Sequence, residues 1–169
     1  MEDKQWNNYK LNIDKRVDKL IKNSLYFEVI FLFSNILETE IKHLIQKYQG
    51  VCQHILNNEN IKFYPKRLFN TEKATLGRLQ KYVSSFIKDK KTLNGISSFN
   101  RLRIKVVHKL LDQELDGLEN QIKVFIPEFY RLMEDLTDKE ISIMQNLRKY
   151  EERLLICKYK SKNIKKSKN

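Results

Sequence analysis

The sequence predicts an all-α protein, a compact bundle of five to six mostly antiparallel helices. The chain has only four Gly and two Pro in 169 residues, too few for the many turns of a β-sandwich or a β-barrel. Apolar residues also recur at helical spacing along most of the chain, between short polar segments. We expect a single domain over residues 1–157, because a chain of this length can bury a core of its own.

The first half of the chain is expected to contain the central helix of the bundle. A first helix is predicted over residues 6–23, where apolar residues gather near one face. A second is predicted over residues 24–49, and it is apolar nearly all round as far as Phe33. A helix that is apolar on every side is buried on every side, so this helix should be the central one. Gly50 suits a C-terminal cap for it.

Two further helices are expected after a loop. Thr71 is a plausible N-cap for a helix over residues 71–87. Ser97 or Ser98 is expected to cap the next helix, which covers residues 97–115.

The last part of the chain predicts two more helices and a tail. Residues 115–136 continue helically, with Pro127 expected to kink or break the helix. Thr137 followed by acidic residues is typical of a helix start, so a last helix is expected over residues 137–160. The segment 158–169 contains six Lys and no acidic residue, and we expect it to be a disordered basic tail.

Half of the net charge of +12 lies in this tail. A cluster of Lys residues raises the affinity for any polyanion through counterion release, without sequence preference. Binding of nucleic acid through the tail is therefore one hypothesis. The alternative is compositional drift in an AT-rich genome, because the chain is rich in Lys, Asn and Ile together.

Several classes of protein do not fit the sequence. No apolar run approaches the ~20 residues that a membrane span needs, and the first ten residues contain no apolar signal core. We therefore expect a cytoplasmic protein that does not enter a membrane. Cys52 and Cys157 are too few for a disulfide framework. No Cys and His residues have the spacing of a zinc site and there is no Gly-rich phosphate loop, so neither a metal nor a cofactor is expected.

The helix over residues 97–115 has one polar arc and one apolar arc at about 100° per residue. Arg101, Lys105 and His108 share the polar arc, which needs no function if it is simply solvated. The apolar arc is expected to face the core, and its members are Phe99, Leu102, Ile104, Val106, Val107, Leu110 and Leu111.

Arg103 falls in the middle of the apolar arc. Burying an unpaired guanidinium is too costly to be tolerated, so two interpretations remain open. Arg103 pairs with a carboxylate inside the chain, for which Glu38 and Glu40 of the central helix are the candidates. Alternatively, it forms an anion site at an interface and binds a phosphate there.

The segment RIKVVH, from Arg103 to His108, resembles the R-x4-6-H signature of HEPN domains, compact helical bundles found in many prokaryotic RNA-targeting toxins and phage-defence proteins. Arg101 and His108, with six residues between them, fit the looser form of the signature. The segment FSNILETEIKHLI is similar to the first core helix of these domains, and TLGRLQKYV resembles a Leu-Gly-x-Leu turn ahead of their motif helix. The resemblance covers about residues 25–115.

The resemblance implies a metal-independent endoribonuclease that acts as a homodimer, with the motif helices of two protomers facing each other across a cleft. In such enzymes the 2′-hydroxyl of the RNA attacks the adjacent phosphorus and leaves a 2′,3′-cyclic phosphate. Carried over to this chain, His108 is the expected acid or base and Arg103 stabilises the phosphate charge. Arg101 and Lys105 are the expected substrate-binding residues.

Two departures from the family pattern support an alternative function. Ile104 stands where a polar residue usually follows the motif Arg, and Leu110 stands where one toxin subgroup has Tyr. Many HEPN proteins are also inactive scaffolds or regulators. The alternative is therefore a catalytically inactive helical module that binds nucleic acid or a protein partner, such as an antitoxin or a larger effector.

Overall fold

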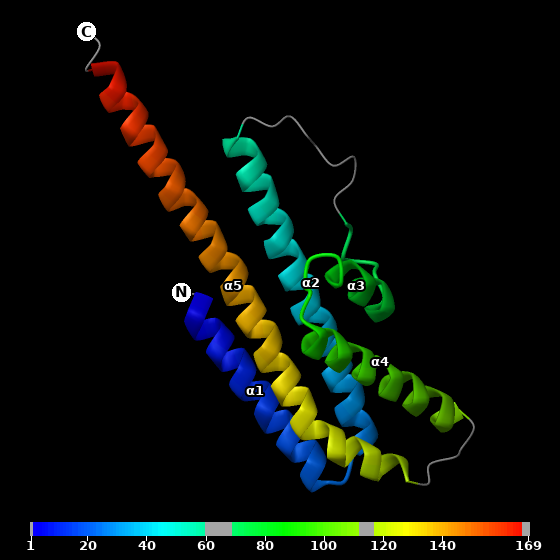
Figure 1. Ribbon diagram of the computed structural model, residues 1–169. Helices are drawn as coiled ribbons and strands as arrows, with labels where there is room; N and C mark the ends of the chain where they lie inside the picture. The colour runs from blue at the N-terminus through cyan, green and yellow to red at the C-terminus, as the bar shows by residue number, and fades with distance from the viewer. Residues whose placement is uncertain (1, 60–68, 112–116, 167–169) are drawn as a thin grey trace.

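The computed structural model describes residues 2–59, 69–111 and 117–166, and it describes side chains for residues 12–59, 69–111 and 117–154. Most of these residues belong to helices, and the described part of the chain contains no strand, so the predicted all-α fold is confirmed. The helices are α1 (Glu2–Lys22), α2 (Tyr26–Asn58), α3 (Leu76–Val83), α4 (Lys90–Leu111) and α5 (Leu118–Lys166) (Figure 1).

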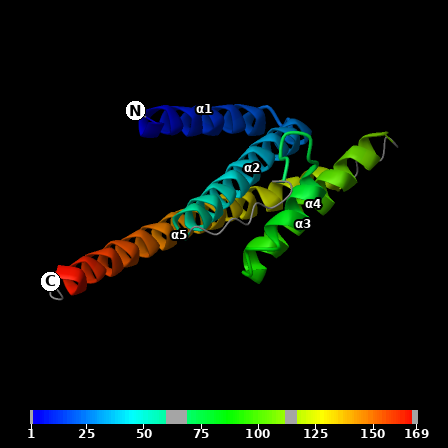
Figure 2. The ribbon, with the colours of Figure 1, turned by 90° about the horizontal axis from the view of Figure 1, so that it is seen from above.

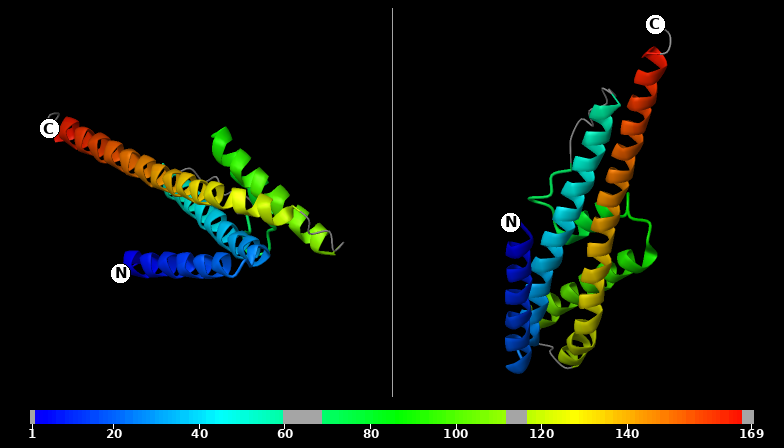
Figure 3. Two further views of the ribbon diagram at one scale, coloured as in Figure 1. Left: turned by 90° about the horizontal axis from the view of Figure 1, so that it is seen from below. Right: turned by 90° about the vertical axis from the view of Figure 1, so that its left-hand side faces the viewer.

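The two longest helices, α2 and α5, pack against each other and form the middle of the molecule. α1 lies on one side of this pair, and α3 and α4 lie on the other (Figure 2, Figure 3). Phe33 contacts Phe129, and Tyr150 bonds to Glu59 further along both helices. Residue numbers thus rise in the same direction along both helices, so this pair is parallel rather than antiparallel. Between α2 and α5 the chain forms α3 and α4, and α5 begins at the end of the molecule at which α2 also begins.

Three phenylalanine rings from three helices form the centre of the core. Phe33 of α2 stacks on Phe129 of α5, with ring centroids 3.8 Å apart, and the ring of Phe99 of α4 lies 5.4 Å from that of Phe129. All three side chains are buried. α4 also approaches α5 closely at Gly95, where an added Cβ would lie 2.9 Å from Cδ1 of Leu132. This packing fixes the middle of α4 against the core.

α2 extends beyond its expected end. It continues through Gly50 to Asn58, so the expected cap at Gly50 is wrong. The extension contacts α5 through His54 and Glu151, with Nε2 and Oε1 3.0 Å apart, and through Glu59, which accepts a hydrogen bond from Tyr150. Tertiary contacts of this kind outweigh the roughly 1 kcal/mol by which a glycine disfavours a helix interior.

α3 and α4 begin at other residues than expected. The helix expected from Thr71 begins only at Leu76, and Thr71 itself is buried, with its hydroxyl accepting a hydrogen bond from Gln46. α4 begins at Lys90, so Ser97 and Ser98 lie inside the helix rather than at its cap.

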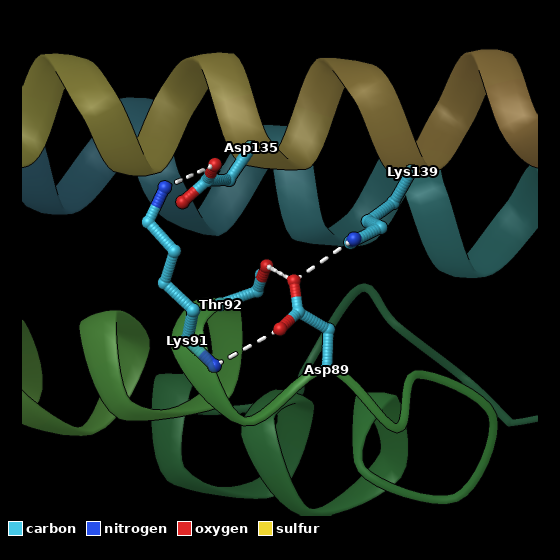
Figure 4. A network of polar contacts seen from close by, with 5 residues as sticks. All are labelled: Asp89, Lys91, Thr92, Asp135 and Lys139. Atoms are coloured by element: carbon cyan, nitrogen blue, oxygen red, sulfur yellow. Dashed lines mark hydrogen bonds and ion pairs between the residues drawn. The ribbon is translucent and has the colours of Figure 1, made fainter.

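Asp89 is the residue that caps α4 (Figure 4). Its Oδ1 accepts a hydrogen bond from the backbone N–H of Lys91, and its Oδ2 accepts one from the hydroxyl of Thr92. Lys139 of α5 lies 2.9 Å from the same Oδ2. The hydrogen bond from Lys139, and then those from Thr92 and Lys91, lower the pKa of Asp89 to about 2. A second pair, Lys91 with Asp135 of α5, completes this network, which ties the start of α4 to α5.

A single helix replaces the two helices expected at the end of the chain. α5 runs through Pro127 and Thr137, and its N-terminal turns bend relative to the rest (Figure 1), as a proline inside a helix requires. Thr137 donates to the carbonyl of Met133, so it is a residue of the helix interior and the expected cap is wrong. The helix also includes residues 158–166 of the segment that we expected to be a disordered basic tail. Adding residues to an existing helix is favourable, and Lys is a good helix former.

Among the residues that the structure describes, no helix is both long enough and apolar enough to cross a membrane.

Candidate functional site

A cleft with a volume of about 390 Å³ lies between α2 and α4. Arg103 and His108 of α4 both line it, so the two residues of the R-x4-6-H pattern share one concave surface. The other lining residues are Phe31, Ser34, Asn35 and Glu38 of α2 and Ile104 and Val107 of α4.

Arg103 is bound to two residues of α2. Its Nη1 donates to Oε1 of Glu38 at 3.1 Å and to Oγ of Ser34 at 3.2 Å. The side chains of Arg103 and Glu38 are 27% and 25% exposed, so the pair lies at the edge of the core. Glu38 is therefore the partner of Arg103. Glu40, the other candidate, lines a separate pocket between α1, α2 and α5.

The helix geometry explains why these three groups meet. Ser34 and Glu38 are four residues apart, so successive turns of α2 present both side chains on one face. On α4, Arg103 follows the buried Phe99 by one turn. Because the core holds Phe99 in place, the next turn of α4 carries the guanidinium to α2.

The guanidinium of Arg103 keeps N–H groups for a further partner. Both hydrogen bonds to α2 involve Nη1, whereas a guanidinium has five N–H groups on three nitrogens. Nε and Nη2 can therefore bind an anion in the cleft while Glu38 fixes the orientation of the group.

His108 lies at the rim of the cleft. Its side chain is exposed, and within the described residues no hydrogen bond or ion pair fixes its ring. Both ring nitrogens can therefore reach a bound molecule. An imidazole beside a guanidinium can exchange a proton with a substrate whose negative charge the guanidinium binds.

Arg101 and Lys105 do not line the cleft. Nη2 of Arg101 lies 3.4 Å from Oγ of Ser98 on the same helix, and Nζ of Lys105 donates to Oε1 of Gln121 of α5 at 2.8 Å. Both residues are exposed. The structure thus divides the four predicted site residues into a pair inside the cleft and a pair outside it.

Three of the side chains that line the cleft are apolar and exposed. Phe31 and Ile104 are each 44% exposed and Val107 is 39% exposed, and Leu111, at the end of α4, is 75% exposed. The expectation that the whole apolar arc of α4 faces the core is therefore wrong, since only part of it is buried. The expectation that the first turns of α2 are buried on every side is wrong as well, because Phe31 is not. α5 packs against α2 and α4 on the side away from the cleft. No described segment covers the side that carries the cleft.

Three residues of the cleft were missed in the sequence. Ser34 binds Arg103, while Asn35 and Phe31 line the walls. The sequence did contain a signal for one of them. Ser34 is a polar residue in the most apolar segment of the chain, and it lies four positions before Glu38.

Comparison with known proteins identifies no relative of this chain. No protein-family model, curated protein or solved structure matches the chain. The side chains in the described part of the chain also contain no group of three or more His, Cys, Asp or Glu residues that could hold a metal ion.

Proposed function

We propose that the protein is a HEPN-like, metal-independent endoribonuclease, a toxin or defence effector that cleaves RNA in the cleft between α2 and α4. The observation that supports this proposal is that Arg103 and His108, five positions apart on α4, line the same cleft. An imidazole can transfer protons and a guanidinium can stabilise phosphate charge, and phosphodiester transfer without a metal depends on both of these functions.

In the proposed reaction the 2′-oxygen of a ribose attacks the adjacent phosphorus. The bond between phosphorus and the 5′-oxygen breaks, and a 2′,3′-cyclic phosphate remains on one product. A base removes the proton of the 2′-hydroxyl, and an acid donates a proton to the departing 5′-oxygen. His108 suits either role because imidazole exchanges protons near neutral pH. Arg103 stabilises the charge that develops on the non-bridging phosphate oxygens.

A homodimer would supply both the acid and the base. The cleft of one chain contains a single histidine, His108, and the reaction transfers two protons. A two-fold axis beside the cleft would bring a second His108 to it. The exposed side chains of Phe31, Ile104 and Val107 make part of the cleft lining apolar, and exposed apolar surface is of the kind that a second copy would contact.

The test is cleavage of RNA by purified protein in the presence of EDTA. We expect the wild type to produce 2′,3′-cyclic phosphate ends, and His108→Ala to be slower by a factor on the order of 10²–10⁴. His43→Ala is the matched control, because His43 is an exposed histidine of α2 that does not line the cleft. The proposal fails if His108→Ala cleaves RNA as fast as the wild type.

A second candidate function is that of a catalytically inactive HEPN-type module that binds a protein partner, such as an antitoxin or a larger effector. The ion pair between Arg103 and Glu38 favours it, because it neutralises the guanidinium within one chain. In that case the exposed apolar surface around the cleft would contact the partner. The purified protein should then leave RNA intact, and a cyclic-phosphate product would exclude this function.

A further inference from the structure

The positive charge of the chain is concentrated in two segments. α3 and α4 together contain eight Lys and Arg residues and no acidic residue. The segment 158–169 contains six Lys and no acidic residue. Because the whole chain has a charge of +12, all other residues together carry −2. Compositional drift would add Lys throughout the chain, so it does not account for this separation of charge.

On α4 the basic residues form a stripe on the outward face. Lys90, Arg101 and Lys105 are exposed, and Arg101, Lys105 and His108 follow Lys90 by 11, 15 and 18 positions. This spacing keeps all four residues near one face of the helix, over a length of about 27 Å. The stripe therefore ends at His108, on the rim of the cleft.

α3 packs against α4 and has two exposed basic residues of its own. Between Lys90 and Arg101, Oγ of Ser97 accepts a hydrogen bond from Gln80 of α3. Arg78 and Lys81 lie within two positions of Gln80 and are exposed. We call the surface formed by Arg78, Lys81, Lys90, Arg101 and Lys105 the α3–α4 basic face.

Carboxylates do not neutralise this face. In the described part of the chain, Lys91 of α4 pairs with Asp135 and Arg103 pairs with Glu38, and neither pair involves a residue of the α3–α4 basic face. Asp89, the acidic residue between the two helices, is bound to Lys139 of α5. The charges of the face are therefore available to a polyanion.

We infer that the α3–α4 basic face binds a single strand of RNA and leads it to the cleft at His108, an inference that rests on the proposed function. A single strand matches the geometry because the charges follow one line along a helix rather than two rows across a groove. The phosphates bound to the α3–α4 basic face then set the affinity of the strand. Arg103 and His108 act on a different phosphate, the one inside the cleft.

Binding is best measured by fluorescence anisotropy with a labelled 2′-O-methyl RNA strand of mixed sequence, which lacks the attacking hydroxyl and is not cleaved. For the double variant R78E/K81E, we expect the Kd to rise about tenfold or more. Its plot of log K against log salt should be less steep by about 1.4, because each lost phosphate contact removes about 0.7 on a single strand.

α1 offers a matched control. Arg16 and Lys19 are exposed and three positions apart, as Arg78 and Lys81 are, and α1 lies on the other side of α2 and α5 from α3 and α4 (Figure 2). R16E/K19E makes the same change in net charge and should alter the Kd less than twofold. Far-UV circular dichroism verifies that both double variants are folded.

The outcomes separate this inference from the proposed function. If both double variants weaken binding equally, or neither does, the α3–α4 basic face is not the RNA-binding surface, although loss of cleavage in H108A would still support the nuclease. If R78E/K81E alone weakens binding but unmodified RNA is never cleaved, the binding face stands and the proposed nuclease does not. Displacement of the strand by polyglutamate as readily as by unlabelled RNA would overturn the assignment to RNA.

Discussion

Two ion-paired regions fix α4 to its neighbours, and they differ in what surrounds them. At the start of the helix, Asp89 binds Lys139 and Lys91 binds Asp135 (Figure 4). Further along, Arg103 binds Glu38. Asp89 and Lys139 are about as exposed as Arg103 and Glu38, so burial does not distinguish the two regions.

The difference lies in the remaining hydrogen-bonding capacity and the adjacent surface. Asp89 accepts from a backbone N–H, a hydroxyl and an ammonium group, which leaves it little capacity for a ligand. Arg103 uses one of its three nitrogens and borders an open cleft with His108 and exposed apolar side chains. The comparison teaches that an ion pair marks a candidate site only when its charged group has hydrogen-bonding capacity left and borders an accessible space.

The largest expected effect comes from removing the cation of each region. Arg103→Ala should lower the rate of RNA cleavage by a factor on the order of 10³, because it removes the donor that stabilises the transition-state charge. Lys91→Ala should leave the rate within twofold, because the side chain of Lys91 is 71% exposed and lies outside the cleft. The initial rates of RNA cleavage by the two variants test this prediction. Equal rates for the two variants would mean that the two regions are functionally alike.

A smaller effect is expected from placing a charge on the apolar rim of the cleft. Ile104→Glu should raise the dissociation constant of the proposed dimer by a factor on the order of 10², because a carboxylate is costly to bury in an interface. Size-exclusion chromatography with light scattering measures this change. Ile141→Glu is the control, since Ile141 is a similarly exposed isoleucine on α5. A wild type that is monomeric at all concentrations would contradict the proposed dimer.

The smallest effect is expected in the network at Asp89, and it concerns stability. The pKa of this carboxyl in the folded protein is about 2, below its ordinary value, so the charged form stabilises the fold. This stabilisation is complete above about pH 4 and is lost as the pH falls through 2. Asp89→Asn should therefore lower Tm by a few degrees at pH 7, and the difference from the wild type should shrink between pH 4 and pH 2 and vanish below pH 2.

Thermal unfolding across this pH range checks the prediction. Glu128→Gln is a control on an exposed carboxylate of α5, and it should leave the pH profile of Tm unchanged. A constant difference between Asp89→Asn and the wild type from pH 7 to pH 2 would mean that the network does not depend on the charge of Asp89.

The helical class was predictable from the sequence, but the ends of the helices were not. Few glycines and a helical spacing of apolar residues are local properties, and they led to the correct class. Gly50 and Thr137 are typical of helix ends, yet both lie inside helices because contacts with a neighbouring helix or a continuous register outweigh a weak local preference. Asp89 was overlooked as a cap because two of the three bonds to its carboxylate come from side chains, and one of these, from Lys139, comes from α5.

The candidate site was predictable to the extent that burial of charge forces a partner. Arg103 had to find a carboxylate, and Glu38 was one of the two candidates. The exposure of Ile104 and Leu111 could not be predicted, because periodicity identifies an apolar arc but not which part of it has a neighbour. The nuclease, the dimer and the bound RNA stay predictions.

The stacked rings in the core also determine how far apart the walls of the cleft stand. Phe129 of α5 lies between Phe33, which precedes the cleft residue Ser34 on α2, and Phe99, which precedes Arg103 by one turn on α4. The ring of Phe129 therefore acts as a spacer between two walls that it does not itself line. A change in the size of this one buried side chain would alter the width of the cleft, so selection on the fit of a bound molecule can act on α5 without any change in the residues that touch that molecule.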